Sequence, residues 1–495
     1  MEKFLAGLEM ILQVKVILFL GIGSLIGWVI GILPGLTVTL GVTLALPISL
    51  FLQPLEALAL LIGIYQSGVF AGSISAILLN IPGTPAATAT AIEGNLMTRK
   101  GEGGLAVNVA LISSVAGGIG GAIALTFIAP LIAKIAVEFG FFEITSILIF
   151  ALMGVILISG DSIIKSLIAA SIGFSLSTLG LDPVSGIVRL TFGIPRLIAG
   201  ISLLPMLIGL FGLSEIFIQF TKFNKVKIAS DKTQFPSIFS TFKYLVKYYK
   251  TVVRSIFIGI FIGALPGAGP GTASFISLSE AKRSSKEPEK FGKGAVEGII
   301  ATETANNTVC GSAFIPLLTL GIPGDVITAV MMGALMVHGL RPGPMLFAKQ
   351  GEYVFGIYIL LFLSAVIMFF FNCILLPFAV KITAIPSEYL YPVLVMLCIL
   401  GTFLINRQIF DLWVMLVLGV LGYFLRKLKY PLPSLLLAFI LGPRFEVVFR
   451  QSLFVSKNSF LPFLTKPISL LFLVLTFITL FVVLRRKWLE KRSTT

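Results

Sequence analysis

Two proline–glycine turns interrupt long apolar stretches of this sequence. The first covers residues 80–85 (NIPGTP) and the second covers residues 321–325 (GIPGD). A helix-breaking turn in a bilayer exposes backbone amides and carbonyls that lipid cannot satisfy, so it is stable only inside protein or beside a water-filled cavity. Two such turns in corresponding halves of an apolar chain indicate a membrane transporter with its binding site at the turns.

Composition agrees with a membrane environment. Of the 495 residues, 57% are hydrophobic and 12% are charged, whereas soluble domains carry about 25% charged residues. Apolar runs of about 18 residues or more recur throughout, so we predict an all-α polytopic membrane protein with roughly 12 spans. The run that begins near residue 16 continues into the first repeat without a convincing cleavage site. This favours an uncleaved first span over a signal peptide.

The net charge of +15 predicts orientation in the lipid bilayer rather than binding to nucleic acid. Basic residues cluster in short connections and near the C-terminus, at residues 485–492. The one long polar segment, Lys222 to Arg254, carries eight Lys or Arg and a single acid, Asp231. Because cytoplasmic loops are rich in Lys and Arg, we expect this segment and the C-terminal tail to be cytoplasmic, and likewise the cluster Arg426-Lys427 with Lys429.

Two similar units are visible along the chain. Residues 27–35 (GWVIGILPG) open the first and residues 259–267 (GIFIGALPG) open the second. In each unit the Ile-Pro-Gly turn follows about 50 to 60 residues later, which indicates a duplication. The predicted segments are a first transmembrane half, residues 15–221; a basic cytoplasmic linker, 222–254; a second transmembrane half, 255–425; and C-terminal spans with a basic cytoplasmic tail, 426–495.

The relative orientation of the units is predicted from charge. Residues 51–56 contain no basic residue, whereas the matching connection, residues 282–293, contains five. Opposite orientations in the membrane explain this asymmetry, so we favour inverted repeats over parallel ones. The pair Arg99-Lys100 and its counterpart Arg341 do not separate the two arrangements.

The first turn offers groups for an anionic ligand. Pro82 and Pro85 remove backbone donors and end the incoming helix, and we expect Gly83 to permit the reversal. Thr84 would cap the next helix, whose amides form a positive end suited to a carboxylate. Asn80 would complete the hydrogen bonds to the ligand. The alternative is a proline-kinked, tightly packed helix with Ser and Thr bonded to their own backbone.

The second turn adds acids. Glu303 precedes it in the sequence ETANNT, and an ionisable residue at membrane depth should face a cavity or a partner. Asn306 and Asn307 would bind substrate oxygens. The alternative for Glu303 is a solvated position near the loop that ends at Gly298. For Asp325 the alternatives are a cation site and an N-cap of the following helix.

These motifs define the candidate residues. Substrate binding is predicted at Ser73, Asn80, Gly83, Thr84, Asn306, Asn307 and Gly324. The coupling ion or proton is predicted at Glu303, Thr304 and Asp325. Structural turns are predicted at Pro34, Gly35, Pro82, Pro85, Pro266, Gly267 and Pro323.

Other chemistry finds no support in the sequence. A Gly-x4-Gly-Lys-Ser/Thr motif and a His-Glu-x-x-His motif are both absent, and His338 is the single histidine. Cys310, Cys373 and Cys398 have no metal-ligand spacing and are interpreted as small buried residues. We therefore expect no enzyme, no catalytic residue, no cofactor, and no metal apart from a coupling Na⁺; the coupling ion is Na⁺ or H⁺.

The chain resembles the large membrane subunit of the tripartite tricarboxylate transporters (TctA) over roughly residues 15 to 425. Long motifs in order carry the resemblance: GILPG at 31–35, the stretch 72–90 with NIPGTP, Glu93-Gly94, LPGAG at 265–269, ETANN at 303–307, Ile315-Pro316, LGIPG at 320–324 and GLRPGP at 339–344. One departure is YQSGVFAGS at 65–73, where family members often have a Tyr-Gly-Gly-Ser-type run. That departure leaves the substrate open.

The resemblance implies ion-driven import of tri- or dicarboxylates across a prokaryotic inner membrane. Its implied partners are a small membrane subunit (TctB-like) and an extracytoplasmic solute-binding protein (TctC-like). From the residues we expect helix N-termini after Gly83 and Gly324 to hold substrate, and the apolar runs between residues 355 and 484 to form a lipid-facing scaffold. A channel and a non-transporting membrane assembly subunit are the alternatives.

Overall fold

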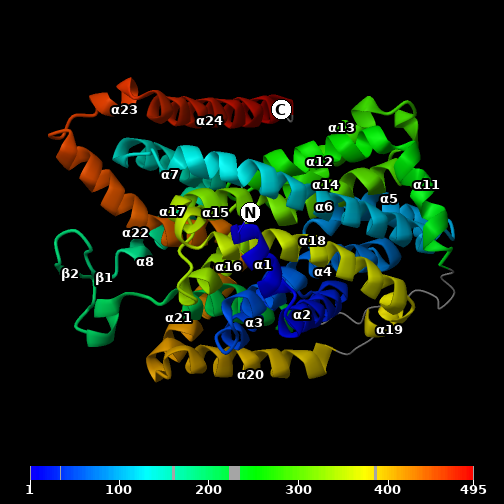
Figure 1. Cartoon of the computed structure of the whole chain (residues 1–495), viewed down its shortest axis with the longest axis horizontal. Coiled ribbons are helices and arrows are strands. Elements are labelled where there is room, and N and C mark those ends of the chain that lie inside the picture. The colour runs from blue at the N-terminus through cyan, green and yellow to red at the C-terminus, as the bar shows by residue number, and fades with distance from the viewer. Residues whose placement is uncertain (1, 34, 159–161, 222–234, 384–386, 494–495) are drawn as a thin grey trace.

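The computed structural model describes residues 2–33, 35–158, 162–221, 235–383 and 387–493. Most of these residues lie in helices, many of which run roughly side by side (Figure 1). Within the described part of the chain, nine helical segments are long and apolar enough to cross a membrane. The predicted helical fold is confirmed apart from one short two-stranded sheet, and the nine candidate spans are consistent with the predicted multi-pass membrane protein. Pro34 and residues 222–234 of the predicted linker lie outside the described residues.

The elements follow one another in four stretches. Residues 2–136 form α1 (Glu2–Ile11), α2 (Val14–Ile32), α3 (Val38–Ser49), α4 (Pro54–Leu79), α5 (Ala87–Arg99) and α6 (Gly103–Ala136). Residues 141–220 form α7 (Phe141–Ile158), α8 (Ile163–Ser177), the antiparallel strands β1 (Gly180–Leu181) and β2 (Val188–Arg189), η1 (Pro195–Ala199), α9 (Leu203–Leu207), η2 (Ile208–Leu213) and α10 (Ser214–Phe220).

The second half of the chain continues in the same way. Residues 238–349 form α11 (Ile238–Lys247), α12 (Tyr249–Ala264), α13 (Gly269–Ser284), η3 (Pro288–Lys290), α14 (Val296–Ser312), α15 (Phe314–Leu320), α16 (Val326–Val337) and α17 (Pro344–Lys349). The remainder forms α18 (Gly351–Leu375), η4 (Leu376–Phe378), α19 (Ala379–Thr383), α20 (Ser387–Asn406), α21 (Ile409–Lys427), α22 (Leu432–Val455), α23 (Leu461–Thr465) and α24 (Pro467–Ser493).

Burial separates a central helix from the periphery. The apolar segment of α4 is 100% buried in the protein, whereas that of α24 is 6% buried. An exposed helix of this hydropathy is typical of a surface that faces lipid. The segment predicted as residues 426–495 begins inside α21, because that helix continues to Lys427.

The two turns share their backbone geometry. Asn80 ends α4 with φ 59°, and Gly321 ends α15 with φ 68°. The amides of Ile81 and Ile322 each bond to a carbonyl six residues earlier, at 3.4 and 3.2 Å. The amides of Asn80 and Gly321 bond to carbonyls four residues earlier, at 3.1 and 2.9 Å. This arrangement is an αL-type helix end, which needs a residue in the left-handed region.

Gly83 therefore has a different role from the predicted one. Asn80, and not Gly83, supplies the left-handed residue of the first turn. A Cβ at Gly83 would lie 2.0 Å from the carbonyl oxygen of Gly31, and one at Gly324 would lie 2.4 Å from that of Gly263. Both glycines are needed because the turn touches the backbone of a neighbouring helix.

Close helix contacts of the same kind hold the centre together. A Cβ at Gly27 of α2 would approach the Ile64 carbonyl oxygen of α4 to 2.4 Å. Gly117 and Gly121 of α6 would approach carbonyl oxygens of α14 to 2.2 and 2.3 Å. Small residues spaced four apart allow membrane helices to pack backbone to backbone.

α4 and α14 enter the protein from opposite ends. The Glu93 carboxylate near the end of α5 accepts three amide hydrogen bonds from the loop before α14, the shortest from Gly292 at 2.5 Å. The His338 ring at the end of α16 lies 3.1 Å from the Ser49 carbonyl oxygen, just before α4 begins. In Figure 1, the β1–β2 pair and α11 lie at opposite ends of the molecule.

Candidate functional site

Four helices begin at the wall of one cavity of about 470 Å³. α3 begins after Thr37, α5 after Ala86, α13 after Ala268 and α16 after Asp325, and all four of these residues line the cavity. α3 and α13 follow the Leu-Pro-Gly sequences, whereas α5 and α16 follow the Ile-Pro-Gly turns. Both units therefore contribute the same two kinds of helix start to one site.

Side-chain caps fix three of these helix starts. The hydroxyls of Thr37 and Thr84 each accept a hydrogen bond from the amide three residues later, both at 3.2 Å. The Asp325 carboxylate accepts the equivalent bond at 2.7 Å. The predicted cap at Thr84 and the N-cap alternative for Asp325 are both confirmed. Caps of this kind orient the remaining free amides of the first turn.

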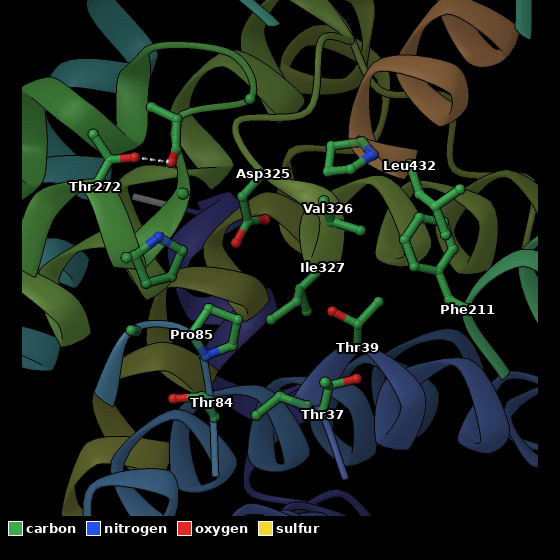
Figure 2. A pocket seen from close by; sticks show the side chains of 18 of the residues that line it. Thr37, Thr39, Thr84, Pro85, Phe211, Thr272, Asp325, Val326, Ile327 and Leu432 are labelled. Atoms are coloured by element: carbon green, nitrogen blue, oxygen red, sulfur yellow. Dashed lines mark hydrogen bonds between the residues drawn. The ribbon is translucent and has the colours of Figure 1, made fainter. Parts of the chain in front are cut away.

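The opposite wall comes from helices outside the two turns. It includes Ile158 of α7, Phe211 of η2, Arg426 of α21, and Tyr430 and Leu432 at the start of α22. Figure 2 shows Phe211 and Leu432 across the cavity from Thr84 and Pro85, with Asp325 pointing into the space between them.

This cavity suits a small anion. The first amides of a helix have no acceptor within the helix, and aligned peptide dipoles make that end positive. Four such ends at one cavity favour a carboxylate or phosphate. The volume of about 470 Å³ falls within the usual range for small-ligand sites, about 300–1,000 Å³.

Asp325 also links the cavity to the first unit. Its carboxylate accepts a hydrogen bond of 2.6 Å from the Tyr65 hydroxyl, and both side chains are buried. Its second oxygen is bonded by the amide and the hydroxyl of Thr328, each at 2.7 Å. A negative charge beside a carboxylate-binding space repels substrate unless a cation or proton compensates it.

Glu303 lies in the protein interior. Its carboxylate is fully buried and contacts three hydroxyls from three helices: Ser73 of α4 at 2.6 Å, Ser114 of α6 at 2.9 Å, and Thr90 of α5. The alternative of a solvated Glu303 near a loop is wrong, because the helix carries it into the centre. A buried carboxylate is retained in an apolar interior only with such donors or with a bound cation.

Neighbouring polar groups on α14 remain unpaired. Thr304, Asn306 and Asn307 are fully buried. The hydroxyl of Thr304, both polar atoms of the Asn306 amide, and the carbonyl oxygen of the Asn307 amide have no hydrogen-bond partner among the described residues. Since buried polar groups normally have partners, a water molecule or an ion is expected beside them.

The predicted substrate residues fall into three places. Thr84 lines the cavity. Gly83 and Gly324 pack against the backbone of neighbouring helices. Ser73 donates a hydrogen bond to Glu303. Asn80 is exposed at the end of α4 and does not line the described cavity, because it serves as the left-handed helix end. Asn306 and Asn307 lie in the α14 cluster rather than on the cavity wall.

The sequence interpretation missed several residues of the site. Thr37 lies in no motif, and Tyr65 was noted only as the first residue of the run 65–73 and not as a site residue. Arg426 was assigned to a cytoplasmic basic cluster, yet it lines the cavity and pairs with buried Glu215. Glu215 is the one charged residue in the largely apolar run 203–220. An isolated acid in such a run is the signal that would have identified this pair.

The sequence of this chain is similar to those of known proteins. Residues 17–437 match the model of the "Tripartite tricarboxylate transporter TctA family". An uncharacterized 52.8 kDa protein in the TAR-I ttuC' 3'region of Agrobacterium vitis is 33% identical over 463 residues, covering 94% of this chain and 92% of that protein. A second Agrobacterium vitis protein, from the TAR-II ttuC' 3'region, is 37% identical over 197 residues, covering 40% of this chain and 81% of that protein.

No solved structure gives a significant match. The family match spans most of the chain and includes both Pro-Gly turns and all four helix starts at the cavity. The chain belongs to the tripartite tricarboxylate transporter TctA family.

Proposed function

We propose that this chain is the large transmembrane subunit of a binding-protein-dependent secondary transporter. It imports di- or tricarboxylates across a prokaryotic inner membrane, driven by a Na⁺ or H⁺ gradient. A small membrane subunit (TctB-like) and an extracytoplasmic solute-binding protein (TctC-like) complete the system. The observation that carries the proposal is the cavity where helix N-termini of both units meet, because it provides positive dipole ends for substrate carboxylates.

The two units are proposed to be inverted repeats. α5 ends beside the start of α14, while α16 ends beside the start of α4, so equivalent helices run in opposite directions. Among the described residues, four shorter apolar helices, in α3, α8, α16 and α20, add to the nine long segments, and the total is compatible with the roughly 12 spans proposed. In this arrangement the two turns meet near the membrane midplane, where transporters of this kind bind substrate.

Glu303 and Asp325 are proposed to take up the coupling cation or proton. The oxygens of Thr304, Asn306 and Asn307 would supplement Glu303, since hard oxygen ligands suit Na⁺. Neutralising Asp325 would remove the repulsion between its carboxylate and an incoming substrate. Substrate binding and ion binding would then favour each other, which is the basis of symport.

Transport requires the two cavity walls to move relative to each other. The turn-bearing wall comes from α3, α5, α13 and α16, and the other from α7, η2, α21 and α22. We propose that movement of the first wall against the second opens the cavity to alternate sides of the membrane.

The test is uptake into proteoliposomes that contain this chain with its small subunit and binding protein. Radiolabelled succinate, malate, tartrate and citrate are supplied under an imposed Na⁺ gradient or an imposed pH gradient, without ATP. We expect accumulation with one of the gradients, and its loss in Asp325→Asn but not in Glu289→Gln, a control that removes an exposed carboxylate.

Two results would overturn the proposal. Uptake that only equilibrates, together with single-channel currents, would identify a channel. Absence of both uptake and carboxylate binding would identify a non-transporting assembly subunit.

A further inference from the structure

Arg426 is a basic side chain on the cavity wall opposite the helix starts. It lies in the last turn of α21, and its side chain is 24% exposed. Arg426 lies beside Phe211, and Figure 2 shows Phe211 across the cavity from Thr84 and Pro85, which precede α5. Positive helix ends and the Asp325 carboxylate therefore face the cavity from one side, and the Arg426 guanidinium, which is paired with Glu215, faces it from the other.

Neighbouring side chains fix the position of the Arg426 guanidinium but do not occupy all of its N–H donors. One terminal nitrogen is paired with Glu215, whose side chain is 6% exposed and also accepts a hydrogen bond of 3.0 Å from Gln219. The guanidinium lies 5.9 Å from the centre of the Phe211 ring. The buried Nε atom has no hydrogen-bond partner among the described residues.

A guanidinium has five N–H donors and takes a carboxylate through two of them at once. Glu215 occupies one terminal nitrogen, so donors remain for a second carboxylate. Asp325 on the other wall is already occupied by Tyr65 and Thr328 and is not paired with Arg426. The remaining donors of Arg426 are suited to an acid group of a ligand that enters the cavity.

We propose that Arg426 binds a second carboxylate of the substrate and makes the site selective for molecules with at least two carboxylates. This inference rests on the proposed function. One carboxylate lies at the helix N-termini of the turn-bearing wall, and the other lies at Arg426. A monocarboxylate reaches only one wall. Only a substrate with two carboxylates contacts both walls of the cavity at once. Such a substrate therefore stabilises the conformation in which the two walls enclose it.

The test measures binding by calorimetry to the full-length chain in lipid nanodiscs. The probes are succinate and succinamate, which differ by one carboxylate replaced with an amide, together with citrate and malate. In the wild type we expect succinate to bind more tightly than succinamate. In Arg426→Gln the affinity for succinate should fall about 10- to 100-fold, as for loss of a charge-assisted hydrogen bond, with little change for succinamate.

Two further variants keep the test informative if Arg426→Gln does not fold. Arg426→Lys retains the charge but not the two-pronged geometry, so its preference for succinate should be intermediate. Glu215→Gln removes the competing acid and should increase the preference for succinate. Gln219 and the new amide are expected to keep the local packing, which thermal unfolding of each variant checks.

The outcomes distinguish failure of the proposed transport function from failure of the role proposed for Arg426. If the wild type binds none of the four probes and transports none of them, the proposed function fails. If the wild type binds succinate but the succinate-to-succinamate ratio is unchanged in Arg426→Gln, or in both Arg426→Lys and Glu215→Gln, the role of Arg426 is overturned. A purely structural ion pair would lower the stability of these variants without changing that ratio.

Discussion

The Tyr65 hydroxyl donates a 2.6 Å hydrogen bond to Oδ2 of Asp325, across 260 residues of sequence. Tyr65 lies within α4 of the first unit, and Asp325 begins α16 of the second. Ser73 and Glu303 form a second bond of 2.6 Å between the same two units. Since Asp325 also lines the cavity, α4 helps to position a helix start of the other unit.

Tyr65→Phe removes this donor from a buried carboxylate. Loss of one partner of a charged, buried group costs about 1–3 kcal/mol, so we expect a lower unfolding temperature and slower uptake. Tyr358→Phe is the matched control, because the Tyr358 hydroxyl is buried without a partner among the described residues. Thermal unfolding in detergent should show a loss for the first variant and no loss for the second. Equal effects would contradict a specific role for the Tyr65–Asp325 bond.

Two substitutions distinguish a backbone role of Asn80, as the left-handed end of α4, from a role in substrate binding. Its φ of 59° favours glycine, which occupies the equivalent position as Gly321. We expect Asn80→Gly to retain uptake and stability, whereas Asn80→Ala should lose about 1 kcal/mol of stability from the strained backbone. If the side chain binds substrate, both variants lose uptake. Uptake by the two proteins, normalised to their amounts in the membrane, distinguishes the roles.

The fold was predictable to the extent that it depends on hydropathy and turn chemistry. Apolar runs predicted the multi-pass architecture, and proline with glycine marked the breaks that became the starts of α5 and α16. The roles within a turn were harder to assign. Asn80 takes the left-handed role that was expected of Gly83, and Gly83 instead makes a close contact with the Gly31 carbonyl. A glycine can serve either purpose, and only the neighbouring backbone decides which.

The site was less predictable than the fold because it is assembled from distant segments. Thr37, Tyr65 and Arg426 reach the site only through helix packing, and no local motif marks them. Glu303 was recognised as an unusual acid, but its three hydroxyl partners come from three other helices. Side-chain partners between helices are not encoded by sequence spacing, so periodicity alone does not identify them.

Substitutions at two glycines of α2 distinguish the effect of close helix packing on stability from the effect of helix propensity. A Cβ at Gly27 would meet the Ile64 carbonyl oxygen at 2.4 Å, whereas one at Gly21 would have only an ordinary contact of 3.7 Å with Phe371. Gly27→Ala should push α2 away from α4 and destabilise the protein by more than about 2 kcal/mol. Gly21→Ala should be neutral or stabilise by up to about 1 kcal/mol. Unfolding temperatures that fall equally would argue against close backbone packing between α2 and α4 at Gly27.

The local stability of the β1–β2 hairpin should depend on pH. The Arg450 guanidinium holds the pKa of the Asp182 carboxyl well below its ordinary value of 3.8, helped by the Ser185 hydroxyl and the Val184 amide. A lowered folded-state pKa gives stability that is complete above 3.8 and decreases as the pH falls toward the folded-state pKa. Pepsin cleavage within residues 180–189 reports this local stability.

Asp182→Asn lacks this titration and controls for the activity of pepsin itself. The ratio of cleavage rates, variant to wild type, should decrease as the pH is lowered from about 4 to about 2, because the wild type progressively loses its advantage. A constant ratio would mean that the Asp182 carboxylate does not stabilise the hairpin.

Glu303→Gln tests whether the buried acid couples transport to an ion. The amide has nearly the same shape, and the hydroxyls of Ser73 and Ser114 can still bond to it, so we expect a folded protein. Without the negative charge, a cation or proton has no reason to bind there, and gradient-driven accumulation should fall to simple equilibration. Ser114→Ala is the matched control: it removes one hydrogen bond but keeps the charge, so coupling should persist with a modest loss of stability. Retained accumulation in Glu303→Gln would assign Glu303 to helix packing and leave Asp325 as the coupling acid.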